Sequence, residues 1–270
     1  MSIRFDNTFK TLRSKKEGAF VPFVTLHDPD YGTSLEILKT LHQNGADILE
    51  LGFPFSDPCA DGPTIQKGNK RALASGSTTM HCLNLIKEYR LYDDKTPISL
   101  LIYANLITSF GIEEFFIKAK ESGVDCVLIA DVPTIMADCV LHNFAEKAKN
   151  KVDLVFIAPP DASKENLNKI AQMSESYIYC VSRTGITGNT TRYGRPYQTI
   201  KYLKSISQLP LLVGFGIASV ADVQDVMSTH ADGCICGSAI VSLIEKNLNN
   251  KEIMLHDIGA FVTNLKQACR

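Results

Sequence analysis

The chain has 270 residues, of which 45% are hydrophobic and 21% charged, and its formal net charge is -1. This composition is typical of a soluble globular protein, and the balanced charge favours neither a nucleic acid nor an acidic membrane surface as a partner. The longest apolar runs, such as residues 98–104, are too short to cross a bilayer, and the first residues lack the apolar core of a secretion signal. We therefore expect a cytoplasmic protein.

An amphipathic helix is predicted at the start of the chain, and apolar runs of strand length follow it eight times. The runs span residues 19–25, 46–52, 97–104, 124–131, 153–159, 177–182, 210–216 and 232–237. Most of them are nearly continuous in apolar residues, which is typical of parallel strands that are covered on both faces.

The segments between these runs carry apolar residues at helical spacing. The clearest faces are Leu35, Leu38 and Leu41; Ile112, Phe115, Phe116 and Ala119; Leu141, Phe144, Ala145 and Ala148; and Val220, Val223, Val226 and Met227. Eight strand–helix units in about 250 residues predict an α/β fold, a closed (β/α)8 TIM barrel. We expect residues 1–270 to form a single domain with an extra N-terminal helix. An open doubly wound sheet is the alternative, but no Gly-rich nucleotide loop follows the first run.

The active site of a TIM barrel lies at the carboxyl ends of its strands, so the residues found there limit the chemistry. No strand end carries a lysine, which argues against a Schiff-base aldolase. Among the histidines, only His27 lies near a strand end, so a catalytic zinc site is not favoured. The cysteines form no CxxC pair, and we expect buried free thiols and no metal.

The segment LELGFPFSDPCADGPTIQ (49–66) places an acidic residue inside an apolar strand. Side chains alternate along a strand, so Ile48 and Glu50 share one face and Leu49 and Leu51 the other. The leucines suit the helix-covered face, and Glu50 is predicted to point into the barrel, where burial raises its pKa. A structural glutamate is the alternative, but buried carboxylates gather at functional sites, which favours catalysis.

Two aspartates follow in the same segment. Aspartates in loops rich in Pro and Gly are usually turn-formers, and by this criterion Asp57 and Asp61 are both structural. Asp61 precedes Gly62 and Pro63, so it is also a candidate N-cap for a helix that begins at about Pro63.

Glycines at the last strand ends indicate a phosphate site. Gly188 follows the sixth run, Gly214 to Gly216 end the seventh, and Gly237 with Ser238 ends the eighth and opens a helix. Glycine lets backbone N–H groups approach an anion, and a helix N-terminus attracts negative charge. The alternative is tight-turn glycines without a ligand. The loop SRTGITGNTTRYGRP (182–196) is a candidate lid with three arginines that favour an anionic ligand, or else a mobile surface loop.

With these features in place, the sequence closely resembles the tryptophan synthase α subunit family. The similarity runs almost end to end through KEGAFVPFVTLHDP, LELGFPFSDPCADGPTIQ, YANL, GVDCVLIADVP, IAPP, SRTGITG, GFGI and GSAIV. The block PFSDP-x-ADGP-x-IQ is highly specific to this family. The resemblance implies a TIM-barrel lyase that splits indole-3-glycerol phosphate into indole and glyceraldehyde 3-phosphate by a retro-aldol reaction.

The resemblance also assigns roles to individual residues. It places the two catalytic carboxylates on Glu50 and Asp61, which replaces the structural interpretation of Asp61. The implied substrate-binding residues are Phe23, Tyr103, Tyr179, Thr187 and Phe215. The implied phosphate-binding residues are Gly188, Gly216, Gly237 and Ser238. The loop expected to face a partner comprises Pro54, Phe55, Ser56, Asp57 and Pro58.

The partner implied by the resemblance is the tryptophan synthase β subunit, in an α2β2 heterotetramer. That subunit holds pyridoxal phosphate and joins indole to serine, so we expect no cofactor in this chain. Three residues depart from the family pattern: His27 stands where glycine is usual, Phe53 where an aliphatic residue is common, and Cys59 precedes the ADG motif. Three alternatives remain: a different phosphosugar or indole-pathway barrel, a stand-alone lyase that releases indole, and a non-catalytic barrel that activates the β subunit.

Overall fold

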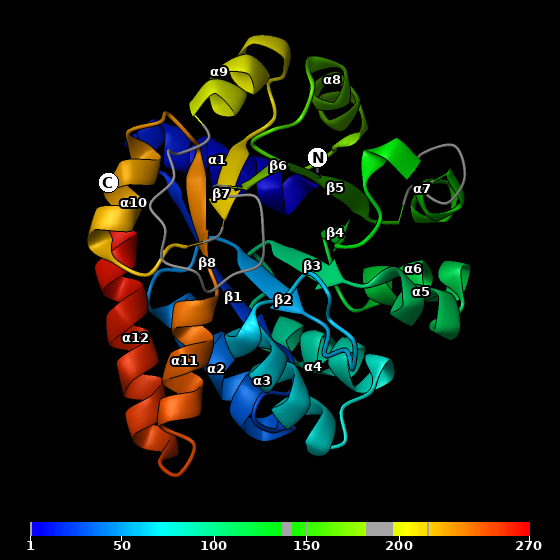
Figure 1. Cartoon of the computed structure of the whole chain (residues 1–270). Coiled ribbons are helices and arrows are strands. Elements are labelled where there is room, and N and C mark those ends of the chain that lie inside the picture. Colours follow the sequence, from blue (N-terminus) through cyan, green and yellow to red (C-terminus); the bar gives the residue numbers. More distant parts are fainter. Residues whose placement is uncertain (1, 137–141, 150, 182–196, 215) are drawn as a thin grey trace.

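The computed structural model describes residues 2–136, 142–149, 151–181, 197–214 and 216–270. Within these ranges, parallel strands close into a barrel in the order β1 to β8 (Figure 1), and the TIM-barrel prediction is confirmed. The strands are β1 (Ala19–Thr25), β2 (Leu49–Gly52), β3 (Ile98–Ile102), β4 (Cys126–Ile129), β5 (Asp153–Ala158), β6 (Ile178–Val181), β7 (Leu211–Gly214) and β8 (Gly233–Cys236). Each lies inside one of the predicted runs. Most are shorter than the run, because the end residues leave the ladder and enter the loops.

Helices surround the barrel (Figure 1). The first six are α1 (Ile3–Lys15), α2 (Tyr31–Gln43), α3 (Pro63–Ala74), α4 (Thr79–Tyr92), α5 (Ala104–Phe110) and α6 (Ile112–Glu121). A 3-10 turn, η1 (Thr134–Met136), precedes α7 (His142–Ala148), α8 (Lys164–Met173), α9 (Tyr197–Ile206), α10 (Val220–Met227), α11 (Ser238–Lys246) and α12 (Lys251–Gln267). The four helical faces predicted from the sequence fall on α2, α6, α7 and α10; Leu141 lies outside the described residues. None of the helices within the described residues is long and apolar enough to span a membrane.

Two apolar layers follow from the alternation of side chains along each strand. Leu49 and Leu51 of β2 belong to the cluster between the strands and the helices, whereas Ile48 belongs to a second cluster inside the barrel. The predicted alternation in β2 is therefore confirmed. It directs Glu50 to the interior, on the same side as Ile48.

Helix α1 belongs to the inner cluster. Its Phe5, Phe9 and Leu12 are spaced by about one helical turn and are buried. The Phe5 ring stacks on Tyr177, next to β6, with ring centroids 5.7 Å apart. The N-terminal helix thus supports an aromatic side chain in the barrel interior.

Carboxylates at the amino ends of four strands make the same pair of hydrogen bonds to the preceding strand. Each acidic residue donates its backbone N–H to the carbonyl of one residue in the preceding strand. Its side-chain carboxylate accepts a hydrogen bond from the backbone N–H of that strand residue. The side-chain bonds are Phe20 to Asp47 (2.8 Å), Ile98 to Asp125 (2.9 Å), Leu154 to Glu175 (2.7 Å) and Leu211 to Asp232 (2.7 Å). We call these four residues the carboxylate clamps. They recur at every second strand and join the strands in pairs.

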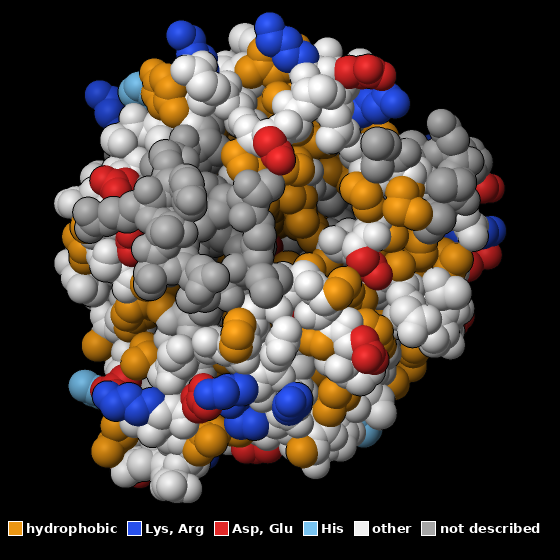
Figure 2. Space-filling model, viewed as in Figure 1, with side chains coloured by type: hydrophobic (Ala, Val, Ile, Leu, Met, Phe, Trp, Pro, Cys, Tyr) orange, Lys and Arg blue, Asp and Glu red, His pale blue; other side chains and the backbone are white. Residues whose placement is uncertain are grey.

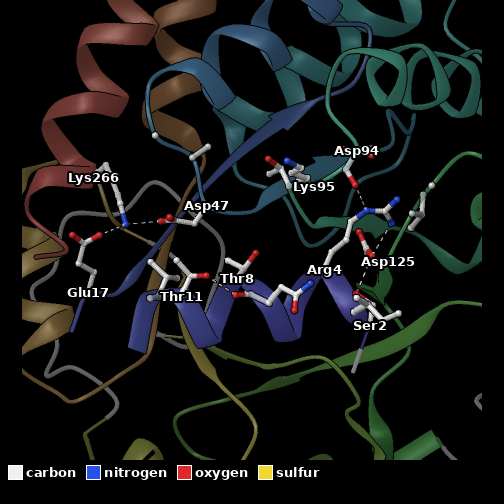
Figure 3. Close-up of a pocket in the computed structure, with 18 of the residues that line it drawn as sticks. Ser2, Arg4, Thr8, Thr11, Glu17, Asp47, Asp94, Lys95, Asp125 and Lys266 are labelled. Carbon is white, nitrogen blue, oxygen red and sulfur yellow. Dashed lines mark hydrogen bonds and ion pairs between the residues drawn. The ribbon is translucent and has the colours of Figure 1, made fainter. Parts of the chain in front are cut away.

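Cations neutralise three of the clamps, and two of these pairs are drawn in Figure 3. Lys266 of α12 lies 2.9 Å from Asp47 and 3.3 Å from Glu17. Asp125 pairs with Arg4 at 3.1 Å, and also with Arg90 at 3.1 Å. Lys204 pairs with Asp232. The wide hollow in Figure 3 lies at this amino end, between α1 and the strand starts, and the acidic residues that line it include three of the clamps.

Candidate active site

Glu50 is only 1% exposed, and it points into the barrel from β2. Its Oε1 accepts a hydrogen bond of 3.3 Å from the Tyr177 hydroxyl, which in turn lies 2.9 Å from Ser99 Oγ. Burial raises the pKa of Glu50 to about 8, although the bond from Tyr177 opposes the shift. At neutral pH this carboxyl is therefore mostly protonated and able to donate a proton.

Asp61 is half-buried in the loop between β2 and α3. Burial raises its pKa to about 6, against hydrogen bonds from Asn69 and from the Tyr103 hydroxyl, which favour the ionised form. Gly62, and not Asp61, is the N-cap of α3, and it makes no side-chain capping bond. Asp61 is therefore free of the capping role that its position before Pro63 suggests.

Tyr103 holds the loop that carries Asp61. It lies at the end of β3, is 1% exposed, and accepts a hydrogen bond of 3.1 Å from the backbone N–H of Ala60. Its ring also stacks on Phe55, with centroids 5.1 Å apart. The first part of the loop thus has an aromatic contact with the barrel, which reduces its freedom beyond what its Pro-rich sequence suggests.

A small cavity of about 60 Å³ at the carboxyl ends of the strands brings together seven of the eleven predicted catalytic, substrate-binding and phosphate-binding residues; Tyr103 does not line it. Figure 2, which views the molecule as in Figure 1, shows a hollow near the middle of this face with hydrophobic side chains on its walls. The cavity is lined by Phe23, Glu50, Ala60, Asp61, Ile65, Leu101, Tyr179, Gly216, Ile217, Ile235, Gly237 and Ser238. Two carboxyl groups therefore face a pocket that is otherwise largely apolar.

The predicted phosphate residues lie at one side of this cavity. Ser238 is the first residue of α11, and Gly237 is its N-cap. The helix N-terminus supplies unpaired N–H groups and a partial positive charge. Gly216 adopts φ 73°, a left-handed conformation that glycine tolerates better than other residues. This wall of the cavity suits an anion.

Several predicted residues lie outside the described residues. They are Thr187, Gly188, Phe215 and the arginines of the 182–196 loop. Their predicted roles stay predictions, and the lid hypothesis with them.

Within the loop predicted to face a partner, residues 54–58, only the middle is exposed. Pro54 is buried, whereas Ser56 and Asp57 are exposed, and Phe55 and Pro58 are intermediate. Pro54 therefore contributes to the packing of this chain, and the surface available to a partner starts at Phe55.

The three departures from the family pattern have different surroundings. His27 adopts φ 70°, and its ring is buried against His81 at a centroid distance of 5.8 Å. It does not line the cavity, and burial lowers its pKa. Phe53 packs against Phe115 in the outer core. Cys59 is exposed, whereas the other described cysteines are buried free thiols. None of the three removes a carboxyl group from the cavity.

Three polar side chains around the carboxyl groups were not predicted. Tyr177 and Ser99 connect to Glu50, and Asn69 connects to Asp61. Tyr177 has a detectable signal in the sequence, because it lies two positions before Tyr179 in the predicted strand run 177–182 and is therefore expected on the same, interior face. The sequence carries no such signal for Asn69, because its contact with Asp61 depends on how α3 packs against the barrel. No group of three or more His, Cys, Asp and Glu that is able to hold a metal ion occurs in the described part of the chain.

Comparisons with known proteins agree along almost the whole chain. The family model described as "Tryptophan synthase alpha chain" matches residues 9–270. The protein of that name from Helicobacter pylori is 46% identical over 261 residues, which cover 96% of this chain and 98% of the relative. The one from Actinobacillus pleuropneumoniae is 45% identical over 270 residues, with 99% of each chain covered.

Solved structures show the same similarity. Tryptophan synthase subunit alpha from Legionella pneumophila is 31% identical with a TM-score of 0.87, and the match covers 100% of this chain and 99% of that one. A structure described as the tryptophan synthase a2b2 complex from Pyrococcus furiosus contains a chain that is 33% identical, with a TM-score of 0.82 and 92% and 98% coverage. This chain belongs to the tryptophan synthase alpha chain family.

Proposed function

We propose that this chain is the α subunit of a tryptophan synthase and cleaves indole-3-glycerol phosphate to indole and D-glyceraldehyde 3-phosphate. The observation that carries the proposal is the pair of carboxyl groups on one cavity. Their surroundings set the pKa of Glu50 at about 8 and that of Asp61 at about 6. Between these values one group is protonated and the other ionised, which is the arrangement that acid–base catalysis of a lyase reaction needs.

The chemistry divides between the two groups. The Glu50 carboxyl donates its proton to indole carbon 3, which converts the ring into a positively charged indolenine. The Asp61 carboxylate stabilises that charge through the ring N–H. The Glu50 carboxylate then removes the proton of the glycerol hydroxyl next to the ring. The bond between the ring and the glycerol chain breaks, its electrons return to the ring as indole, and the aldehyde leaves.

The remaining walls of the cavity fit the two ends of this substrate. Phe23, Leu101 and Ile235 offer apolar contact to an indole ring. Gly216, Gly237 and Ser238 surround the position where backbone N–H groups at the start of α11 would bind the phosphate. Tyr179 also lines the cavity and belongs to the apolar cluster inside the barrel.

We also propose that a β subunit receives the indole. The a2b2 complex among the similar structures supports such a partner, and the exposed Ser56 and Asp57 lie in the same loop as Asp61. No lysine is among the residues that line the cavity in the described part of the chain, so we assign the pyridoxal phosphate chemistry to the partner. The proposal also includes that the whole chain forms one domain and that it acts in the cytoplasm.

A cleavage assay on indole-3-glycerol phosphate, with and without the β subunit, tests this function. We expect cleavage by the isolated chain and faster cleavage in the complex, because docking on residues 55–58 would further restrain the exposed middle of the loop that carries Asp61. Equal rates in both samples would favour a stand-alone lyase. No cleavage in either sample would contradict the proposal and favour a non-catalytic activator.

A further inference from the structure

We propose that Asn69 of α3 is a positioning residue for Asp61, holding its carboxylate in the orientation and charge state that cleavage needs. The inference deepens the proposed lyase function and rests on it. It starts from a hydrogen bond that the roles of Glu50 and Asp61 do not by themselves require.

The contact joins a buried donor to a half-buried acceptor. Asn69 is 3% exposed, and its Nδ2 donates to Asp61 Oδ2 at 3.2 Å. Gln66 donates from one turn earlier in the same helix to the backbone carbonyl of Asp61, at 2.9 Å. Two side chains of α3 therefore hold Asp61 at both its backbone and its carboxylate.

Helix α3 is itself firmly placed, so Asn69 is a rigid donor. Arg71 binds Asp28 through two parallel hydrogen bonds of 2.7 and 2.8 Å, and the Asp28 side chain is fully buried. A Cβ on Gly68 would lie 2.9 Å from Asp28 Oδ2 and 3.2 Å from Val241 Cγ1. The helix thus packs tightly against the segment after β1 and against α11, which carries Ser238 at its start.

The charge state of Asp61 depends on this donor because few other groups offset its burial. The titratable side chains that interact with Asp61 are Tyr103 and Tyr179. Glu50 lines the same cavity, and Cys59 lies in the same loop as Asp61. Tyr103 hydrogen-bonds to the carboxylate, whereas Tyr179 and Glu50 supply no positive charge. Removal of the Asn69 amide therefore favours protonated Asp61 near neutral pH.

Two variants test the inference by the pH dependence of cleavage. Asn69→Leu removes the donor at similar size, and we expect kcat to fall about 3–10-fold at about pH 6.5 and to recover as the pH rises. Asn69→Asp keeps the shape but adds a second carboxyl, so the acid limb should move further in the same direction. KM should change little in both, because the phosphate wall is untouched.

Asn44→Leu is the matched control. Asn44 donates to the Thr40 carbonyl at 2.8 Å at the end of α2, away from the cavity. Its loss should reduce stability and leave the pH profile unchanged. Circular dichroism verifies that each variant is folded. If Asn69→Leu does not fold, the pH profile of Asn69→Asp tests the inference by itself.

The outcomes separate the inference from the function beneath it. A wild-type chain without cleavage in the complex contradicts the proposed function. A wild-type chain that cleaves, with wild-type pH profiles in folded Asn69→Leu and Asn69→Asp proteins, contradicts only the role of Asn69. A pH-independent loss of rate in both variants also contradicts it, because it indicates a purely structural residue.

Discussion

Carboxylates occupy both ends of this barrel, but their surroundings differ. At the amino ends, the clamp residues Asp47, Asp125, Glu175 and Asp232 each accept a backbone N–H, and three of them also pair with a cation. At the carboxyl ends, Glu50 and Asp61 receive only uncharged donors, and among the described residues no lysine or arginine pairs with them.

The difference shows how one fold uses the same functional group for stability and for chemistry. At the amino ends, hydrogen bonds and cations favour the ionised carboxylate and so oppose the effect of burial; at Asp47 burial raises the pKa, while Lys266 and the Phe20 N–H act against that shift. A buried carboxyl with weak donors has its pKa raised toward neutrality, where it can exchange protons. The second arrangement costs stability, which the rest of the barrel offsets.

Matched substitutions at the two ends sharpen this comparison, and the largest effect is expected for Glu50→Gln. We expect cleavage to fall about 10²–10⁴-fold, because the proton transfers are lost. The fold and the binding of glyceraldehyde 3-phosphate should be retained. The measurement is kcat for indole-3-glycerol phosphate, together with ligand binding by calorimetry.

Glu175→Gln is the matched change at the amino end. Glutamine can still accept the Leu154 N–H, so we expect a loss of about 1 kcal/mol in unfolding free energy and unchanged kcat. Near-normal turnover by folded Glu50→Gln protein would remove Glu50 from the mechanism.

The pair Asp61→Asn and Asp125→Asn should show the next largest contrast. Asp61→Asn removes the charge that stabilises the indolenine, and we expect kcat to fall about 10²–10³-fold at nearly unchanged stability. Asp125→Asn removes the negative charge that pairs with both Arg4 and Arg90, although Arg90 keeps its hydrogen bonds to backbone carbonyls. We expect a loss of about 3 kcal/mol in stability with normal kcat in the folded protein.

Urea unfolding and steady-state kinetics on both aspartate variants measure this contrast. If Asp61→Asn unfolds the protein while its folded fraction stays active, Asp61 is structural and the difference between the two ends disappears.

A smaller effect is expected for Ser238→Asp at the start of α11. A carboxylate there would repel a phosphate, so binding of indole-3-glycerol phosphate and glyceraldehyde 3-phosphate should weaken about tenfold or more. Indole has no phosphate and should bind as before. We prefer this change to Gly216→Val, because φ 73° makes any branched residue at Gly216 strained. Equal weakening for all three ligands would indicate general damage.

The smallest effect concerns pH. The profile of kcat/KM should be bell-shaped, with an acid limb from Asp61 near pH 6 and an alkaline limb from Glu50 near pH 8. The raised pKa of folded Glu50 contributes stability that is present at low pH and is lost as the pH rises from its unfolded value toward about 8. Glu50→Gln should therefore be more stable than wild type at alkaline pH.

Equilibrium unfolding at several pH values measures this difference. The stabilities of wild type and Glu50→Gln should converge at low pH. A constant difference across the whole range would show that the Glu50 carboxyl does not titrate in the folded protein as expected.

The sequence by itself determined the barrel fold and the position of Glu50, one of the two carboxyl groups of the candidate active site. Apolar runs covered on both faces identify parallel strands, and the period-two alternation in β2 directs Glu50 inward. These features depend on local spacing, which a sequence displays directly. The Asp61 assignment came only from the resemblance, because an aspartate in a Pro- and Gly-rich loop has the same local pattern whether it forms a turn or faces a cavity.

Only the tertiary structure decided which side chains surround those groups. Asn69, Tyr177 and Ser99 come from three distant parts of the chain, and their contacts arise from the packing of helices and the closure of the barrel. The clamps likewise join acidic residues to strands 21–27 positions away. Burial and partner geometry, and so the choice between a stabilising and a reactive carboxylate, depend on these long-range contacts, and no local pattern encodes them.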